Sequence, residues 1–248
     1  ITHNYMDFVD KKVVEEYVTT SDHFLHEERI FNTEQKKQLL QSVWSHEKSH
    51  PYYMPDYAIE LASYTGMRVG ELAALKWENI DDNFIHIKLS EHRHDYADKP
   101  SEKVIGLPKN GKIRKFPIFG KIRELLNRIK SLNLSSKEGF VFVDENGNRY
   151  AASTISCASF RRGKEAGIKK ASIHRLRRTV SSELNTVLDS VTVANLLGHT
   201  VTTNLQCYRY DYSSLEEKLA GLHLVDNLFS NFSNIYPFYE DKKIAKAL

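Results

Sequence analysis

Hydrophobic positions recur at helical spacing along much of the chain, and this pattern predicts a mainly helical domain. Leu39, Leu40 and Val43 give one apolar face to a helix that Asn32 or Thr33 can cap. We expect further helices at 55–65, 121–132, 152–166, 174–186 and 189–198. Glycines at 167 and 198 then stand where two of these helices end, which is the usual position of a glycine cap.

A shorter part of the chain alternates like strands. Phe84 to Leu89 has this pattern, and so do Lys103–Leu107 and Ile113–Ile118. Asn110-Gly111 between the last two predicts a hairpin, because both residues tolerate positive φ. We expect residues 90–101 to be a polar loop. The predicted fold class is therefore α+β, mainly α-helical, with a small antiparallel β-sheet or hairpin.

Composition narrows the class of protein. With 41% hydrophobic residues the chain can bury a core, and it holds no run of eighteen apolar residues that would predict a membrane span. No signal peptide is recognisable, so we expect a cytoplasmic protein. Its two cysteines, Cys157 and Cys207, make neither a disulfide framework nor a zinc site. His92, His94, Asp95 and Asp98 could in principle bind a metal ion. They lie in a loop, however, and do not supply four ligands at a spacing typical of a metal site, so we expect no metal or other cofactor.

Positive charge is concentrated in two segments. Residues 161–178 carry a net charge of +7 and residues 99–115 a net charge of +5, in a chain whose total is +3. The rest of the chain is therefore acidic, and the two segments suit a polyanion such as double-stranded DNA. Solvated surface runs would give the same counts. The expected DNA contacts are Lys112, Arg114, Lys115, Arg161, Arg162, Lys164, Arg175 and Arg178.

Six residues form a candidate site, although each has an ordinary structural explanation. Arg68 lies between Gly66 and Gly70, where a glycine lets the backbone approach a ligand or simply makes a turn. The other members are Lys109 before the Asn-Gly turn, His174 and Arg177 three residues apart on one helix, His199 after Leu197-Gly198, and Tyr208.

The order and spacing of these six residues resemble those of the tyrosine recombinase (phage integrase) family. The motifs that match are Thr65-Gly66-Met67-Arg68-Val69-Gly70-Glu71-Leu72, Lys109 with Asn110-Gly111, His174-x-x-Arg177, Leu197-Gly198-His199, and Tyr208 nine residues after the histidine. The resemblance covers about residues 32–215. It implies a catalytic domain that cuts and rejoins DNA through a covalent 3′-phosphotyrosine link. A phage, a conjugative transposon and a chromosome-dimer resolving system all fit, and the loop at 90–101 and the aromatic tail favour an enzyme that integrates or excises a mobile element.

The residue types suit that chemistry. Two arginines, Arg68 and Arg177, can clamp the charge that gathers on an attacked phosphodiester, and Tyr208 can serve as the nucleophile. His174 and His199 can hydrogen-bond the phosphate or move protons. The resemblance implies that Lys109 protonates the leaving oxygen. It also implies that Glu71 supports Arg68 without touching substrate.

The resemblance also implies an organisation. Residues 1–31 would link to a missing N-terminal domain that binds core DNA, 32–221 would be the catalytic domain, and 222–248 would be a tail that can dock on a neighbouring protomer. We expect the protein to act as a homotetramer on two DNA sites. An excisionase or a host DNA-bending protein is a further expected partner. Three alternatives stay open: a type IB topoisomerase, a non-catalytic DNA-binding protein of the same fold, and a metal-dependent nuclease.

Overall fold

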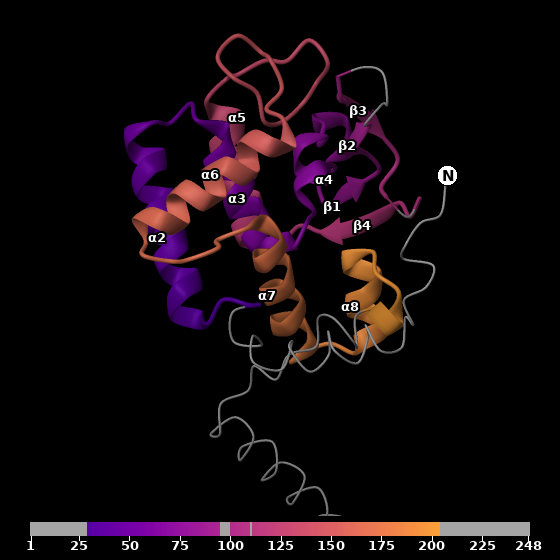
Figure 1. Ribbon diagram of the computed structural model, residues 1–248. Helices are drawn as coiled ribbons and strands as arrows, with labels where there is room; N and C mark the ends of the chain where they lie inside the picture. The colour runs from indigo at the N-terminus through magenta and orange to yellow at the C-terminus, as the bar shows by residue number, and fades with distance from the viewer. Residues whose placement is uncertain (1–28, 95–99, 110, 204–248) are drawn as a thin grey trace, which may run out of the picture. The chain divides into compact units, whose positions relative to one another are not determined.

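Helix α3 (Met54–Thr65) lies at the centre of the computed structural model, which describes residues 29–94, 100–109 and 111–203 (Figure 1). Nearly every side chain of α3 is buried, because helices pack around it on several sides. These are α2 (Thr33–Ser49), α5 (Gly120–Ser131), α6 (Ala152–Glu165) and α7 (Ile173–Asn185). Gly66 ends α3 in the left-handed conformation, with φ of 61°.

The predicted helices are confirmed to within a few residues. Asn32 caps α2 through a capping box, since its side chain accepts from the Gln35 amide and the Gln35 side chain accepts from the Asn32 amide. Asp189 caps α8 (Ser190–Leu197) by accepting from two amides of its first turn. Gly198 closes α8 in the left-handed conformation, with φ of 70°. Local capping residues therefore fixed these boundaries.

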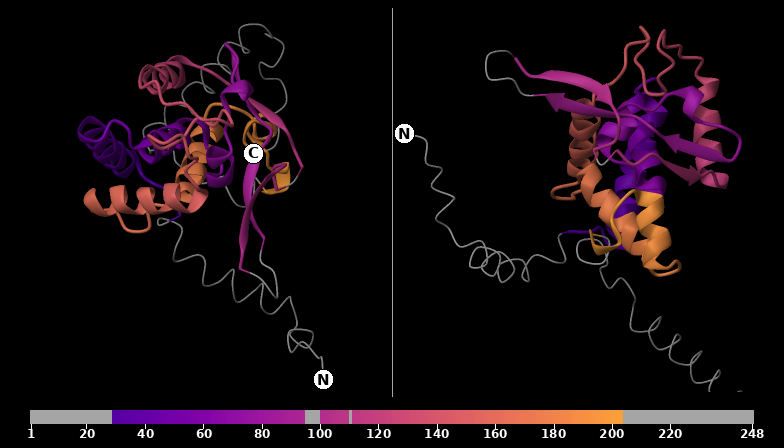
Figure 2. Two further views of the ribbon diagram at one scale, coloured as in Figure 1. Left: turned by 90° about the horizontal axis from the view of Figure 1, so that it is seen from above. Right: turned by 90° about the vertical axis from the view of Figure 1, so that its right-hand side faces the viewer.

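The strands pair differently from the prediction. Strand β1 (Phe84–Ile87) pairs with β4 (Arg114–Pro117), and β2 (Ser90–His94) pairs with β3 (Glu102–Gly106), both antiparallel. The expected hairpin between β3 and β4 is therefore wrong, although the amide of Gly111 does close a turn onto the carbonyl of Pro108. The expected polar loop at 90–101 is also wrong in its first half, which forms β2. Figure 2 shows both pairs beside the helical part.

Two short elements join the strands to the helices. Helix α4 (Val69–Ala73) packs on β2 and α6, and a 3₁₀ turn, η3 (Trp77–Asn79), precedes β1. Helix α8 packs on both α7 and β4, so its carboxyl end lies where helices meet strands. Within the described part of the chain, no helix has the length and apolar character needed to cross a membrane.

Candidate functional site

Arg68 is the N-cap residue of α4, and its side chain is 28% exposed. Its guanidinium donates through Nη1 to Glu71 Oε1 at 2.9 Å and through Nη2 to the carbonyl of Gly198 at 3.2 Å. A guanidinium carries five N–H groups, and these two bonds use two of them. Arg68 is thus held from two sides while retaining donors for an anion.

Glu71 is a fully buried carboxylate that joins two arginines. Besides Nη1 of Arg68, it accepts from the Arg68 amide at 2.8 Å and from Nη1 and Nη2 of Arg114 at 2.8 and 2.7 Å. Burial alone would raise the pKa of Glu71. The hydrogen bonds and charge of Arg114, helped by Arg177 and the Arg68 amide, instead lower that pKa to about 2. Glu71 is therefore ionised throughout the range in which proteins function.

The carboxyl end of α8 is bound by three different arginines. Arg114 Nε donates to the carbonyl of Leu196 at 2.9 Å, Arg177 Nη2 to that of Leu197 at 2.5 Å, and Arg68 Nη2 to that of Gly198. These carbonyls lie at a helix end, where the backbone leaves acceptors unsatisfied and the helix dipole favours cations. The arginines come from β4, α7 and α4, so this helix end gathers three separate elements.

Arg177 and His199 contact each other inside this cluster. Nε2 of His199 accepts from Arg177 Nε at 3.1 Å and lies 2.5 Å from Arg177 Nη2. Arg177 also donates through Nη1 to the carbonyl of Gly66, and its side chain is 1% exposed. An arginine can only donate, so the His199 nitrogen that faces it must carry a lone pair.

Both histidines are neutral at pH 7. Burial, followed by the charges of Arg177, Arg68 and Arg114, lowers the pKa of His199 to about 3. His174 is exposed at the start of α7, but desolvation by surrounding protein and the charges of Arg178, Arg177 and Arg68 lower its pKa to about 4. The same arginines thus act on both rings, which places the expected residues Arg68, His174, Arg177 and His199 in one neighbourhood.

The two glycines around Arg68 support the fold. Gly66 takes the left-handed conformation that ends α3. A Cβ added at Gly70 would lie 2.5 Å from the carbonyl oxygen of Glu91 and 2.7 Å from Oγ of Ser90. The absence of a side chain at Gly70 therefore leaves room for strand β2. The alternative, that it leaves room for a ligand, is not supported.

The contacts described for this cluster include neither of the other two expected residues. Lys109 is exposed in the loop that connects β3 to β4, and no contact described for it reaches the arginines. Tyr208 lies outside the described residues. Asp95 and Asp98 lie outside them as well, and within the described part no three His, Cys, Asp or Glu side chains are grouped to hold a metal ion.

Three of the expected DNA contacts have side chains that are buried against protein partners. Arg114 binds Glu71, and Arg162 lies beside Asp56 and Glu165. Arg175 donates to the carbonyls of Lys169 and Ile30. The remaining ones stay available: Lys112, Lys115, Arg161 and Lys164 are exposed, and Arg178 is half-buried.

Sequence reasoning missed the role of Arg114, although a signal was present. In β4, Arg114 and Phe116 are buried while Lys115 and Pro117 are exposed. A strand alternates its two faces, so the predicted strand already placed Arg114 on the face of Phe116. An arginine on the inner face of a strand requires a buried acceptor, which here is Glu71.

Comparison with known proteins gives consistent matches. The sequence pattern of the phage integrase family matches residues 29–214. A protein named as a XerC-like tyrosine recombinase, from Caldanaerobacter subterraneus subsp. tengcongensis, is 26% identical over 192 residues. The match covers 68% of this chain and 48% of that protein. The chain thus spans about half the length of this curated relative.

Solved structures share the fold. XerA recombinase is 24% identical with a TM-score of 0.59, covering 78% of this chain and 63% of that one. The Tn1549 transposon integrase, in complex with transposon right-end DNA, is 19% identical with a TM-score of 0.63, covering 79% and 66%. Lambda integrase bound to DNA is 21% identical with a TM-score of 0.54, covering 74% and 60%.

Proposed function

The chain belongs to the phage integrase family, and from that membership we propose that it is a site-specific DNA recombinase. It cuts and rejoins double-stranded DNA through a covalent 3′-phosphotyrosine link and so integrates or excises a mobile element. The observation that carries the proposal is the cluster of Arg68, Arg177 and two neutral histidines at the carboxyl end of α8. Such a cluster offers N–H donors and positive charge to one phosphodiester.

The arginines stabilise the charge of the reaction. As the phosphorus is attacked, negative charge grows on its nonbridging oxygens, and donors already fixed in place stabilise that charge most. Arg68 is fixed by Glu71 and Gly198. A phosphate oxygen competes with His199 for the N–H groups of Arg177, and a His199 that gains a proton changes from acceptor to donor.

Tyr208 supplies the attacking oxygen. Its bond to phosphorus replaces the bond to the 5′-oxygen, so one phosphodiester is exchanged for another and the reverse reaction rejoins the strand. As the new bond forms, the tyrosine proton passes to one of the two neutral histidines, and the leaving 5′-oxygen gains a proton from Lys109. The exposed loop that carries Lys109 lets that side chain approach the DNA.

The proposal extends to the organisation of the protein. Residues 32–221 act as the catalytic domain, 1–31 link to a domain that binds core DNA, and 222–248 dock on a neighbouring protomer. The enzyme works as a tetramer on two sites, helped by an excisionase or a host DNA-bending protein. Support comes from a related fold seen as a lambda integrase tetramer bound to a Holliday junction, at 18% identity, a TM-score of 0.54 and coverage of 75% and 50%.

A plasmid carrying two end sites of the mobile element tests this function. We expect the protein to release a circle between the sites in the presence of EDTA, and Arg68→Lys or Tyr208→Phe to abolish the product. Relaxation of supercoiled plasmid without dependence on the sites would favour a topoisomerase. Binding without any cutting would favour a non-catalytic protein, and loss of cutting in EDTA would favour a metal-dependent nuclease.

A further inference from the structure

Arg114 is one of two buried arginines at the end of α8, the other being Arg177. The side chain of Arg114 is 5% exposed, whereas that of Arg68 is 28% exposed. It donates to both oxygens of Glu71, at 2.8 and 2.7 Å. Since Arg68 donates to the same two oxygens, through Nη1 and its amide, the carboxylate accepts four hydrogen bonds and has no remaining lone-pair direction.

The third donor of Arg114 reaches the helix end that carries His199. Nε donates to the carbonyl of Leu196, and a Cβ added at Gly198 would lie 3.1 Å from both Cδ and Nη1 of Arg114. Gly198 therefore leaves the space in which the Arg114 side chain lies. One arginine on β4 thus contacts the support of Arg68 and the turn before His199 together.

We propose that Arg114 is a positioning residue, which holds the Arg68 guanidinium through Glu71 and the His199 turn through the end of α8. This inference rests on the proposed function. Arg114 acts through protein contacts and not on substrate, because both of its Nη nitrogens donate to the Glu71 carboxylate and its Nε donates to the Leu196 carbonyl. It acts by restricting where two phosphate-binding side chains can point.

Lysine cannot replace arginine in this role. A planar guanidinium presents Nη1 and Nη2 to a carboxylate while Nε points elsewhere, but an ammonium is a single point charge. Arg114→Lys keeps the charge and loses the three-way geometry. Misplacing a reacting group by about 1 Å slows a reaction by about 100-fold. We therefore expect a slower cleavage step with nearly unchanged DNA affinity.

The first test measures binding and single-turnover cleavage of a nicked end-site duplex. For Arg114→Lys we expect a Kd within about threefold of wild type and a cleavage rate lower by about 10- to 100-fold. Arg149→Lys is the matched control, because Arg149 also pairs with a largely buried carboxylate, that of Glu91, outside the cluster. We expect the control to cleave at the wild-type rate. Equal losses of binding and cleavage in Arg114→Lys, or no loss at all, would overturn the proposal.

A second test does not depend on activity. In ¹⁵N NMR spectra of the full chain, a guanidinium held on both sides rotates slowly about its Nε–Cζ bond and gives separate Nη signals. We expect Arg68 to show them in wild type and Arg149→Lys, and to lose them in Arg114→Lys. Arg114→Gln gives the same readout if the lysine variant fails to fold. Unchanged Arg68 signals overturn the positioning role, whereas a wild-type protein that never cleaves DNA overturns the proposed function alone.

Discussion

Burial, together with the charge of neighbouring arginines, keeps the imidazole rings of His199 and His174 neutral at pH 7, with pKa values of about 3 and 4. A bound phosphate adds negative charge beside the rings and therefore favours their protonated forms. The pKa of each ring then rises on binding. Binding of DNA must accordingly be linked to uptake of protons, and its affinity must increase as pH falls from 7 toward 5.5.

We predict a net uptake of protons per bound site, and the number taken up grows as pH falls from 7 to 5.5. Calorimetric titration of an end-site duplex in buffers of different ionisation enthalpy measures that number. A variant with both His174→Gln and His199→Gln should bind with clearly less uptake. The same uptake in the double variant would assign the protons to other groups of the chain.

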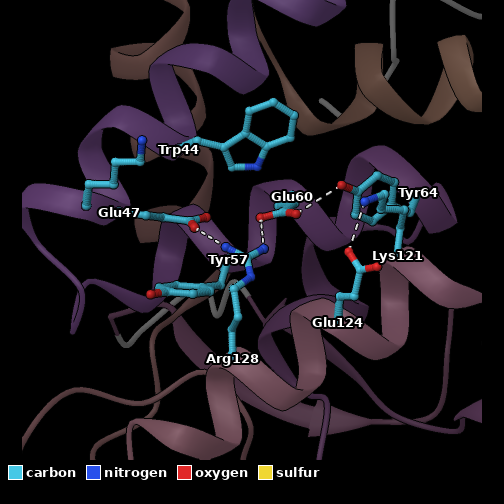
Figure 3. A pocket seen from close by; sticks show the side chains of 9 residues that line it. Trp44, Glu47, Tyr57, Glu60, Tyr64, Lys121, Glu124 and Arg128 are labelled. Carbon is cyan, nitrogen blue, oxygen red and sulfur yellow. Dashed lines mark hydrogen bonds and ion pairs between the residues drawn. The ribbon is translucent and has the colours of Figure 1, made fainter.

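Glu47 is a buried carboxyl group remote from this site. Glu47 lines a cleft of about 520 Å³. Figure 3 shows Arg128 between Glu47 and Glu60 in this cleft. Arg128 Nη1 donates to Glu47 at 2.7 Å, and Arg128 Nη2 donates to Glu60 at 2.5 Å. One guanidinium thus serves two carboxylates. Burial and the charge of Glu60 outweigh Arg128 and raise the pKa of Glu47 to about 8. Glu47 therefore holds a proton at neutral pH.

This raised pKa makes the free energy of unfolding depend on pH. The folded state retains a proton that the unfolded chain releases near pH 4.5, so the stability that Glu47 contributes falls as pH rises from 4.5 to 8. Glu47→Gln resembles the protonated acid and avoids this loss. Urea denaturation should show the variant gaining about 1–4 kcal/mol over wild type between pH 5 and pH 8.5.

The matched control is Glu124→Gln, which removes a carboxylate of the same cleft whose side chain is 65% exposed. The difference in free energy of unfolding between this variant and wild type should not change with pH. If the difference in free energy of unfolding between Glu47→Gln and wild type also stayed constant with pH, this result would contradict the buried, protonated state of Glu47.

At the residue scale, the sequence identified charged side chains but not their partners. Order and spacing were enough to select Arg68, His174, Arg177 and His199, which the structure brings together. Counting charge was not enough for Arg114, Arg162 and Arg175, because each has at least one partner far away along the chain, namely Glu71, Asp56 and Ile30. The distance from Arg114 to Glu71 is 43 residues in sequence.

Helix α8 is the element on which the site depends. Its amino end is fixed by Asp189, and its carboxyl end by Gly198 and the three arginines. Gly198 has two roles there: φ of 70° suits a residue without Cβ, and the absence of Cβ leaves room for Arg114. A substitution at Gly198 disturbs both the backbone and the cluster.

We predict that Gly198→Ala destabilises the protein more than Gly167→Ala. Gly167 also has a left-handed φ, of 71°, but nothing lies near the place of its Cβ. Each alanine carries the backbone cost of about 1–2 kcal/mol, and only Gly198→Ala also displaces Arg114. Urea denaturation should show the larger loss for Gly198→Ala, and equal losses would mean that Arg114 moves aside freely.

Helices were easier to predict than strand pairs. The capping residues Asn32, Asp189 and Gly198 act within a few positions of the ends that they fix, so the sequence shows them directly. Pairing of β1 with β4 joins residues about thirty positions apart, such as Ile87 with Arg114. The local Asn-Gly signal gave a turn but could not select the partner strand.

For the molecule as a whole, the proposed function requires that exposed positive charge attract DNA. Four exposed basic side chains, of Lys112, Lys115, Arg161 and Lys164, remain as proposed phosphate contacts. Each neutralised phosphate releases counterions, so the affinity falls with salt concentration. The number of contacts can therefore be counted from the salt dependence.

We predict that Lys115→Gln and Lys164→Gln each make the slope of log K against log salt shallower by about 1. Binding of a duplex measured by fluorescence anisotropy over a range of salt gives this slope. Lys137→Gln is the control, since Lys137 is exposed but lies outside both basic segments. A slope unchanged in Lys115→Gln and Lys164→Gln would exclude those two contacts.

In the proposed reaction, Tyr208 attacks a phosphodiester held by Arg68 and Arg177. A duplex with a nick beside the cleavage position traps the covalent product, because the cut fragment diffuses away before the strand can rejoin. Peptide mapping by mass spectrometry then identifies the modified residue. We predict nucleotides attached to the peptide at Tyr208, and no adduct for Tyr208→Phe. An adduct that persists in Tyr208→Phe, or that maps to Tyr210, would contradict attack by Tyr208.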